Sequence, residues 1–187
     1  MTTVWIILGI AVLLILLLIS LYNRLVRYRN IRENAFADID VQLKQRHDLI
    51  PQLVEAVKGY MHHESNTLIE VTKARAAALS AQTIDDKIEA ENRLTSALNG
   101  LKVSLEAYPD LKASANFMQL QEEIADVENK LAAVRRYFNS STKEYNTAVE
   151  TFPANVIAGM FGFRREKMFD VGVAERANLE QAPKISF

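Results

Sequence analysis

The chain has 187 residues, 22 basic and 23 acidic side chains, a net charge of −1 and no cysteine. The balanced charge argues against a nucleic-acid partner. The lack of cysteine excludes disulfides, thiol catalysis, cysteine-ligated metals and a lipoprotein anchor. Only six glycines and four prolines interrupt a composition rich in good helix formers, which predicts an all-α fold.

The first long feature is an apolar run, Val4–Tyr22, that contains no charged residue. As a helix it would measure roughly 28 Å, enough to cross a hydrocarbon core of about 30 Å. Residues 1–3 carry no basic side chain and no A-x-A-like site follows the run, so we expect an uncleaved transmembrane helix at 4–22 rather than a signal peptide.

Basic residues cluster directly after this run, at Arg24, Arg27, Arg29 and Arg32. Because basic flanks favour the cytoplasmic side, we expect residues 1–3 to lie outside and the domain that follows to be cytoplasmic. A domain on the periplasmic or extracellular side stays open as the alternative. The four arginines should also contact anionic lipid headgroups.

The region 23–152 shows long apolar stripes whose steps alternate between three and four residues, the spacing of packed helices. No proline or glycine lies between Gly9 and Pro51, so the membrane helix should continue into the domain without a hinge, with a kink at Pro51. The first stripe comprises Phe36, Ile39, Leu43, Arg46, Ile50, Leu53, Val57 and Tyr60.

Further helices are predicted after residue 65 and after residue 83, where Thr83 and Asp86 have the spacing of an N-cap and its third-position acid. An apolar face on the first of these is formed by Leu68, Val71 and Leu79. Pro109 should end the second and start a last helix that runs to Pro153. Its stripe comprises Ala113, Phe117, Leu120, Ile124, Val127, Leu131, Val134, Phe138, Ser141, Tyr145, Ala148 and Phe152.

Together these elements predict an N-terminal transmembrane helix continuing into an antiparallel bundle of three or four long helices over residues 23–152. Residues 153–169 are apolar and then basic, so they should dock on the bundle or a neighbouring protomer, or lie in the membrane interface. Residues 170–187 are polar and weakly patterned, which predicts an extended or disordered tail.

Arg46 interrupts the first apolar stripe. An unpaired buried charge is too costly, so the side chain should either reach out at the edge of the stripe or pair there. The other interpretation is a contact with an acidic residue on a facing helix that sets the register of packing.

Motifs for catalysis are missing. His62, His63 and Glu64 could suggest a metal, but no Glu-x-x-His occurs, and Thr67 stands where H-E-x-x-H needs its second histidine. The sequence also lacks a G-x-S-x-G elbow and the glycine-rich phosphate loops. We therefore predict neither an enzyme nor a cofactor.

Three long segments carry a family resemblance: YNRLVRYRN at 22–30, AFADIDVQLKQRHDLIPQLVEAVKGYMHHE at 35–64 and YPDLKASANFMQLQEEIADVENKLAAVRRYFN at 108–139. With EYN at 144–146, FPANVIAGMFGF at 152–163 and the ending APKISF, the chain resembles the LemA family. The resemblance implies a bacterial single-pass membrane protein with no established enzymatic activity. From the basic residues after the apolar run we expect this membrane to be the inner membrane. The resemblance also implies genomic proximity to membrane zinc proteases or TPM-domain proteins.

Polar residues in the matching segments are predicted to form contacts between helices or between protomers. They are Asp40, Arg46, Asp48, Lys58, Tyr60, Glu64, Asn116, Glu123, Glu128, Arg135, Asn139 and Asn146.

The function predicted is a non-enzymatic scaffold at the bacterial membrane surface that assembles into a homo-oligomer through its stripes. The alternative is a regulatory or binding module for a membrane protease, a TPM-domain protein or another envelope partner. A metal-dependent enzyme is the least favoured hypothesis.

Overall fold

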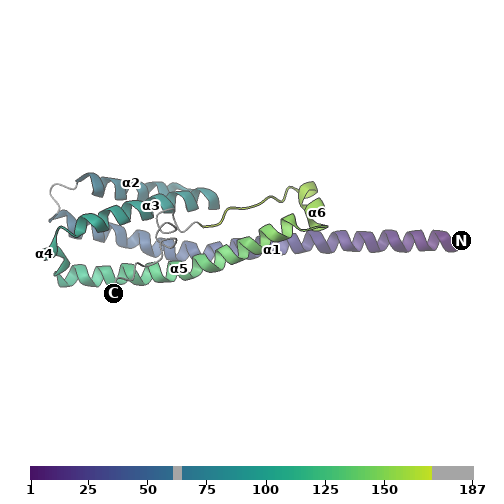
Figure 1. The fold of residues 1–187 in the computed structure, drawn as a ribbon, viewed down its shortest axis with the longest axis horizontal. Helices are drawn as coiled ribbons and strands as arrows, with labels where there is room; N and C mark the ends of the chain where they lie inside the picture. The colour runs from purple at the N-terminus through teal and green to yellow at the C-terminus, as the bar shows by residue number, and fades with distance from the viewer. Residues whose placement is uncertain (61–64, 170–187) are drawn as a thin grey trace, which may run out of the picture. The chain divides into compact units, whose positions relative to one another are not determined.

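The computed structural model describes residues 1–60 and 65–169, and within these it contains α-helices and no strand (Figure 1). This confirms the all-α prediction. The helices are α1 (Thr2–Lys58), α2 (Ser65–Ser80), α3 (Ile84–Leu105), α4 (Pro109–Lys112), α5 (Ala115–Glu150) and α6 (Ala154–Phe161). His62, His63, Glu64 and the tail 170–187 lie outside the described residues.

Helix α1 includes the apolar run and continues through Pro51 to Lys58. The side chains of the run are exposed, and α1 is the one helix in the described part long and apolar enough to cross a membrane. An apolar helix surface that no protein atoms cover needs an apolar surrounding, which a bilayer supplies.

The chain divides into two compact units. Unit 1 comprises Met1–Ile39 and Val134–Met168, and unit 2 comprises Asp40–Ala133 with Phe169 as its remaining described residue. Helices α1 and α5 each supply residues to both units.

Unit 2 is a bundle of four helices, formed by α2, α3 and the parts of α1 and α5 that belong to it. All four, and α4, supply side chains to one core, which comprises Ile50, Leu53, Val57, Leu68, Val71, Ala78, Leu94, Leu101, Leu105, Leu111, Phe117 and Leu120. Thr83 caps α3 as predicted, because its hydroxyl oxygen accepts a hydrogen bond from the backbone N–H of Asp86 at 3.1 Å.

The predicted helix from Pro109 to Pro153 is wrong at its start. The chain forms the single turn α4, whose Leu111 enters the core, and α5 begins only at Ala115. Burial of Leu111 compensates for the break, since a short turn can direct one apolar side chain inward where a straight helix could not.

The predicted stripes are largely buried, but several of their end residues are not. Tyr60, Leu79 and Phe152 are exposed, with Phe152 at 78%. Ala78 is buried in α2 in place of Leu79. Stripes lose their burial at helix ends because no neighbouring helix covers them there.

Unit 1 packs α6 and the C-terminal part of α5 on the first part of α1. Its core comprises Leu25, Tyr145, Ala148, Ala154, Ile157, Ala158 and Phe163. Gly162, at φ 74°, ends α6 in the left-handed conformation that glycine adopts without steric cost. The reversal brings the N–H of Phe163 to the carbonyl of Ala158 at 3.0 Å and returns the Phe163 ring to the core.

Candidate functional site

The strongest polar feature of unit 2 is a charged residue inside its bundle. Arg46 of α1 is only 1% exposed, and its Nη2 donates a hydrogen bond to Oε2 of Glu91 on α3. Its Nη1 also lies 3.0 Å from Oε1 of Glu128 on α5 and 3.1 Å from Oγ1 of Thr95 on α3. One guanidinium thus connects three helices, the arrangement that its fork of five donors permits.

His47 completes the group. Its Nε2 lies 2.7 Å from Oε1 of Glu91, while Arg46 contacts Oε2, so both oxygens of this carboxylate are in contact with basic side chains. The backbone carbonyl of His47 accepts a hydrogen bond from Nε of Arg75 on α2 at 2.8 Å. We call Arg46, His47, Glu91 and Glu128 the buried ion cluster.

Electrostatics keep the Glu91 carboxyl group of this cluster ionised. Burial alone would raise the pKa of the Glu91 carboxyl, but the contact with His47 and the charge of Arg46 outweigh burial and lower this pKa below its ordinary value. Glu91 is therefore an anion at neutral pH even though it is 1% exposed.

Arg46 and Glu128 were predicted from the sequence to make such contacts, whereas Glu91, His47 and Thr95 were not. A signal for Glu91 was present, because it stands three residues after Ile88 and three before Leu94, on the apolar face of α3. An acid in one apolar stripe and an arginine in another is the pattern that a facing pair leaves in a sequence.

Other predicted polar residues are placed in several settings. Asp40 pairs with Lys87 of α3 at 2.7 Å, whereas Asp48 pairs within α1 with Lys44 at 2.9 Å. Lys58 lies 3.9 Å from Glu55, one turn earlier in α1. Tyr60 is exposed, and Glu64 lies outside the described residues.

Five further predicted residues lie on α5. Asn116 and Glu123 line an open groove of unit 2 together with Gln52 and Ala56 of α1. Arg135 and Asn139 are partly buried. Asn146 in unit 1 is buried, and its amide exchanges two hydrogen bonds with the backbone of Glu166, donating at 3.0 Å and accepting at 2.8 Å.

The structure corrects the expectation that Arg32 contacts headgroups. Arg32 is 4% exposed, lies 3.3 Å from the carboxylate of Glu166 and stacks over the ring of Phe138 at 5.1 Å. Arg29 lies over Phe163 at 5.3 Å, and Arg24 over Tyr28 at 5.6 Å. Arg24, Arg27 and Arg29 remain exposed, so their contact with headgroups stays a prediction.

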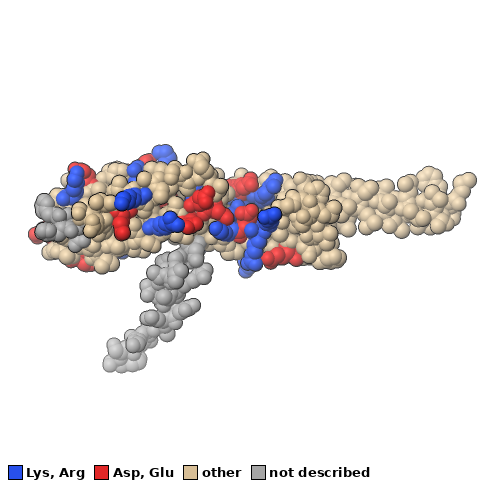
Figure 2. Space-filling model, turned by 90° about the horizontal axis from the view of Figure 1, so that it is seen from above, with Lys and Arg blue, Asp and Glu red and all other residues tan. Residues whose placement is uncertain are grey.

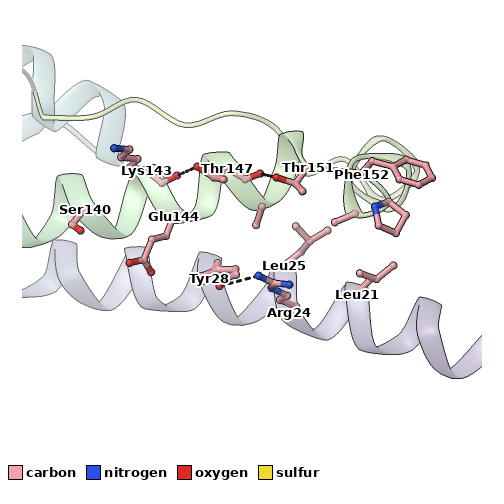
Figure 3. A pocket seen from close by; sticks show the side chains of 13 residues that line it. Leu21, Arg24, Leu25, Tyr28, Ser140, Lys143, Glu144, Thr147, Thr151 and Phe152 are labelled. Carbon is pink, nitrogen blue, oxygen red and sulfur yellow. Dashed lines mark hydrogen bonds between the residues drawn. The ribbon is translucent and has the colours of Figure 1, made fainter.

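A groove of about 430 Å³ in unit 1 lies between α1 and the end of α5 (Figure 3). Leu21, Arg24 and Tyr28 approach from α1, and the hydroxyls of Thr147 and Thr151 from α5. These hydroxyls already donate to carbonyls of their own helix, at 2.8 and 2.6 Å. Lys143 and Glu144 also line the groove, so its lining is mixed, with charged as well as apolar side chains.

Chemically, the buried ion cluster suits a positioning role. No group of three or more histidine, aspartate or glutamate side chains in the described residues has a metal-binding arrangement. Neither groove is lined by Arg46, His47 or Glu91. The ionised groups contact one another, and nothing described places a substrate atom against them.

Comparison with known proteins agrees with the sequence resemblance. The model of the LemA family matches residues 35–187. The chain belongs to the LemA family. Protein LemA of Metamycoplasma hominis is 28% identical over 160 residues, which cover 84% of this chain and 73% of that protein.

Magnetosome proteins are also similar to this LemA-family chain over part of its length. Magnetosome protein MamQ of Magnetospirillum gryphiswaldense is 29% identical over 80 residues, which cover 43% of the chain and 29% of MamQ. Magnetosome protein MamQ 2 of Paramagnetospirillum magneticum is 25% identical over the same shares.

Removing one side of the buried pair should destabilise the protein strongly. We expect Arg46→Met and Glu91→Leu each to lower the free energy of unfolding by about 3–5 kcal/mol, because each removes the closest ionic partner of a buried charge, and the double variant to recover most of that loss. Urea unfolding of the detergent-solubilised chain, followed by far-UV circular dichroism, measures this. The exposed pair Lys44→Met and Asp48→Leu in the same helix serves as the control and should change stability by at most about 1 kcal/mol. A double variant as unstable as the sum of the single ones would contradict the prediction.

Glu91 should also make stability depend on pH. Because its pKa is lowered in the folded state, its contribution is complete above the unfolded-state pKa of about 4.3 and is lost as the pH falls through the lower folded-state pKa. Glu91→Gln should therefore be less stable than the wild type at neutral pH, with the difference shrinking below about pH 4. Denaturant unfolding across this pH range measures the difference in stability between the wild type and Glu91→Gln, with the exposed Glu123→Gln as control. A stability difference that stays constant with pH would contradict the role given to Glu91.

Proposed function

We propose that this LemA-family protein is a non-enzymatic scaffold of the bacterial inner membrane, with its helical bundle on the cytoplasmic side. The observation that carries the proposal is the course of α1. This helix begins with exposed apolar residues and ends among the core residues Ile50, Leu53 and Val57 of unit 2. One element thus serves both as a membrane helix and as a bundle helix.

The use of charge supports a structural role. Enzymes place ionisable groups with shifted pKa values where a substrate can reach them. Here the carboxyl group of Glu91, whose pKa is shifted, is buried between Arg46 and His47, and its shift serves helix packing.

Self-assembly is the part of the proposal that the fold constrains most. The two stripes that motivated it are buried inside a single chain, as Phe36, Leu43 and Leu131 illustrate. A homo-oligomer therefore has to form through other surfaces. The exposed apolar part of α1 and exposed side chains such as Val103 of α3 are among the surfaces that remain for it.

The alternative is a regulatory or binding module for a membrane protease, a TPM-domain protein or another envelope partner. The observation in its favour is the exposed apolar side of α6, where Val156, Met160 and Phe161 are uncovered. The partial similarity to Magnetosome protein MamQ is compatible with either role.

Self-assembly predicts a mass above that of one chain. Light scattering of the detergent-solubilised protein at micromolar concentration should give a multiple of the 21.1 kDa chain mass after subtraction of the detergent. Because the chain has no cysteine, Ile15→Cys and Val103→Cys can report by disulfide cross-linking which surface is shared. A strictly monomeric mass would exclude the scaffold and leave the binding module.

The cytoplasmic orientation predicts a labelling pattern. We expect an impermeant maleimide to label Thr3→Cys in intact spheroplasts and Ser96→Cys only after the membrane is opened, because the two exposed positions lie on opposite sides of the apolar run. Labelling of Ser96→Cys in intact spheroplasts would show the opposite orientation, and it would not contradict the membrane anchor itself.

A further inference from the structure

Helix α6 has two apolar sides, and unit 1 covers only one of them. Ala154, Ile157 and Ala158 are buried against α1 and α5. The other side is exposed at Val156 (54%), Met160 (73%) and Phe161 (60%), and Phe152 just before the helix is exposed as well. We call Phe152, Val156, Met160 and Phe161 the outer face of α6.

Aromatic contacts fix where along α1 this face lies. The ring of Tyr22, the last residue of the apolar run, meets Phe161 edge-on at a centroid distance of 4.9 Å and Phe163 at 5.8 Å. Leu21 lines the same groove as Phe152 and Pro153 (Figure 3). The outer face of α6 is therefore level with the C-terminal end of the apolar run.

Charge in unit 1 has the sign that attracts an anionic bilayer. Its residues include ten lysines and arginines and five acidic residues, a net charge of +5, whereas the whole chain has a net charge of −1. Arg164 and Arg165 directly follow α6 and are exposed, although Arg165 also pairs with Glu150 at 3.1 Å. On the side seen in Figure 2, surface without charged side chains continues from the N-terminal part of α1 onto the adjoining end of unit 1.

We propose that α6 is an interfacial helix whose outer face inserts at the boundary between headgroups and hydrocarbon of an anionic bilayer. Lipid is the occupant because the outer face is continuous with the surface of α1 that already requires an apolar surrounding at the same level. Apolar and aromatic side chains flanked by arginines are the composition that such helices use. This inference rests on the membrane anchoring in the proposed function and needs neither self-assembly nor a partner protein.

Collision accessibility of spin labels in the full-length protein tests the proposal. The cysteine-free chain allows single labels at Met160→Cys on α6, Ile15→Cys in the apolar run and Ser96→Cys at an exposed position of α3. The protein is reconstituted in vesicles of phosphatidylglycerol and phosphatidylcholine. Apolar oxygen concentrates in the bilayer and a nickel chelate in water, so we expect the oxygen-to-nickel accessibility ratio at Met160 to be several-fold above that at Ser96 and closer to that at Ile15.

The outcomes separate this inference from the proposed function. A water-like ratio at Met160 with a lipid-like ratio at Ile15 would overturn the inference and leave the anchoring intact, whereas a water-like ratio at Ile15 would overturn the anchoring itself. A Met160 label shielded from both reagents would show a protein partner on α6 and also overturn the inference.

The charge component has its own control. Arg164→Gln with Arg165→Gln should lower the ratio at Met160 in these vesicles, whereas Arg93→Gln with Lys102→Gln on α3 should leave it unchanged. An equal effect of the two double substitutions would show that the arginines next to α6 make no specific contribution.

Discussion

The packing of unit 2 depends on the contact between Arg46 and Glu91. Removing two charges from water costs several kcal/mol for each ion, so the core tolerates them only where their hydrogen bonds are made. Any slip of α1 against α3 would separate the pair and leave both charges buried. The apolar residues around them, such as Ile50 and Leu94, could pack in more than one register. The ion pair therefore selects one alignment, and Glu128 extends the constraint to α5.

In unit 1 the comparable constraint comes from the chain after α6. Gly162 reverses its direction, Phe163 returns to the core, and Glu166 binds Asn146 through its backbone and Arg32 through its carboxylate. These contacts hold α6 against α1 at the end of the apolar run. Arg32, which the flanking charge pattern predicts to contact headgroups, thereby helps to hold the segment after α6 on α1. Contact of the exposed Arg24, Arg27 and Arg29 with headgroups stays a prediction.

The buried charges among the described residues hold helices together, and the exposed apolar side chains lie on helix exteriors. In an isolated coiled coil, long apolar stripes of this kind pack against another copy of the helix. Here they are buried within one chain, as Leu43 and Val127 show. What the molecule presents outward is the apolar part of α1, the outer face of α6 and a charged bundle surface. The exposed apolar part of α1 is compatible with membrane association, and the outer face of α6 is the surface that we propose to insert at the interface.

Periodicity and composition determined the helices, the apolar run at 4–22, the cap at Thr83 and most of the buried stripe residues, because these depend on local propensity and on spacing along one helix. The sequence also marked Arg46 as anomalous. It did not show that Glu91 and His47 lie against it, that Arg32 is buried, or that Phe152 and Leu79 are exposed. Those facts depend on which helix faces which. The local pattern marks a charge in an apolar stripe, such as Arg46 or Glu91, but does not give its partner. Only the tertiary structure decides which helices face each other. The free-energy cost of a buried charge therefore depends on the group that lies opposite it in the fold.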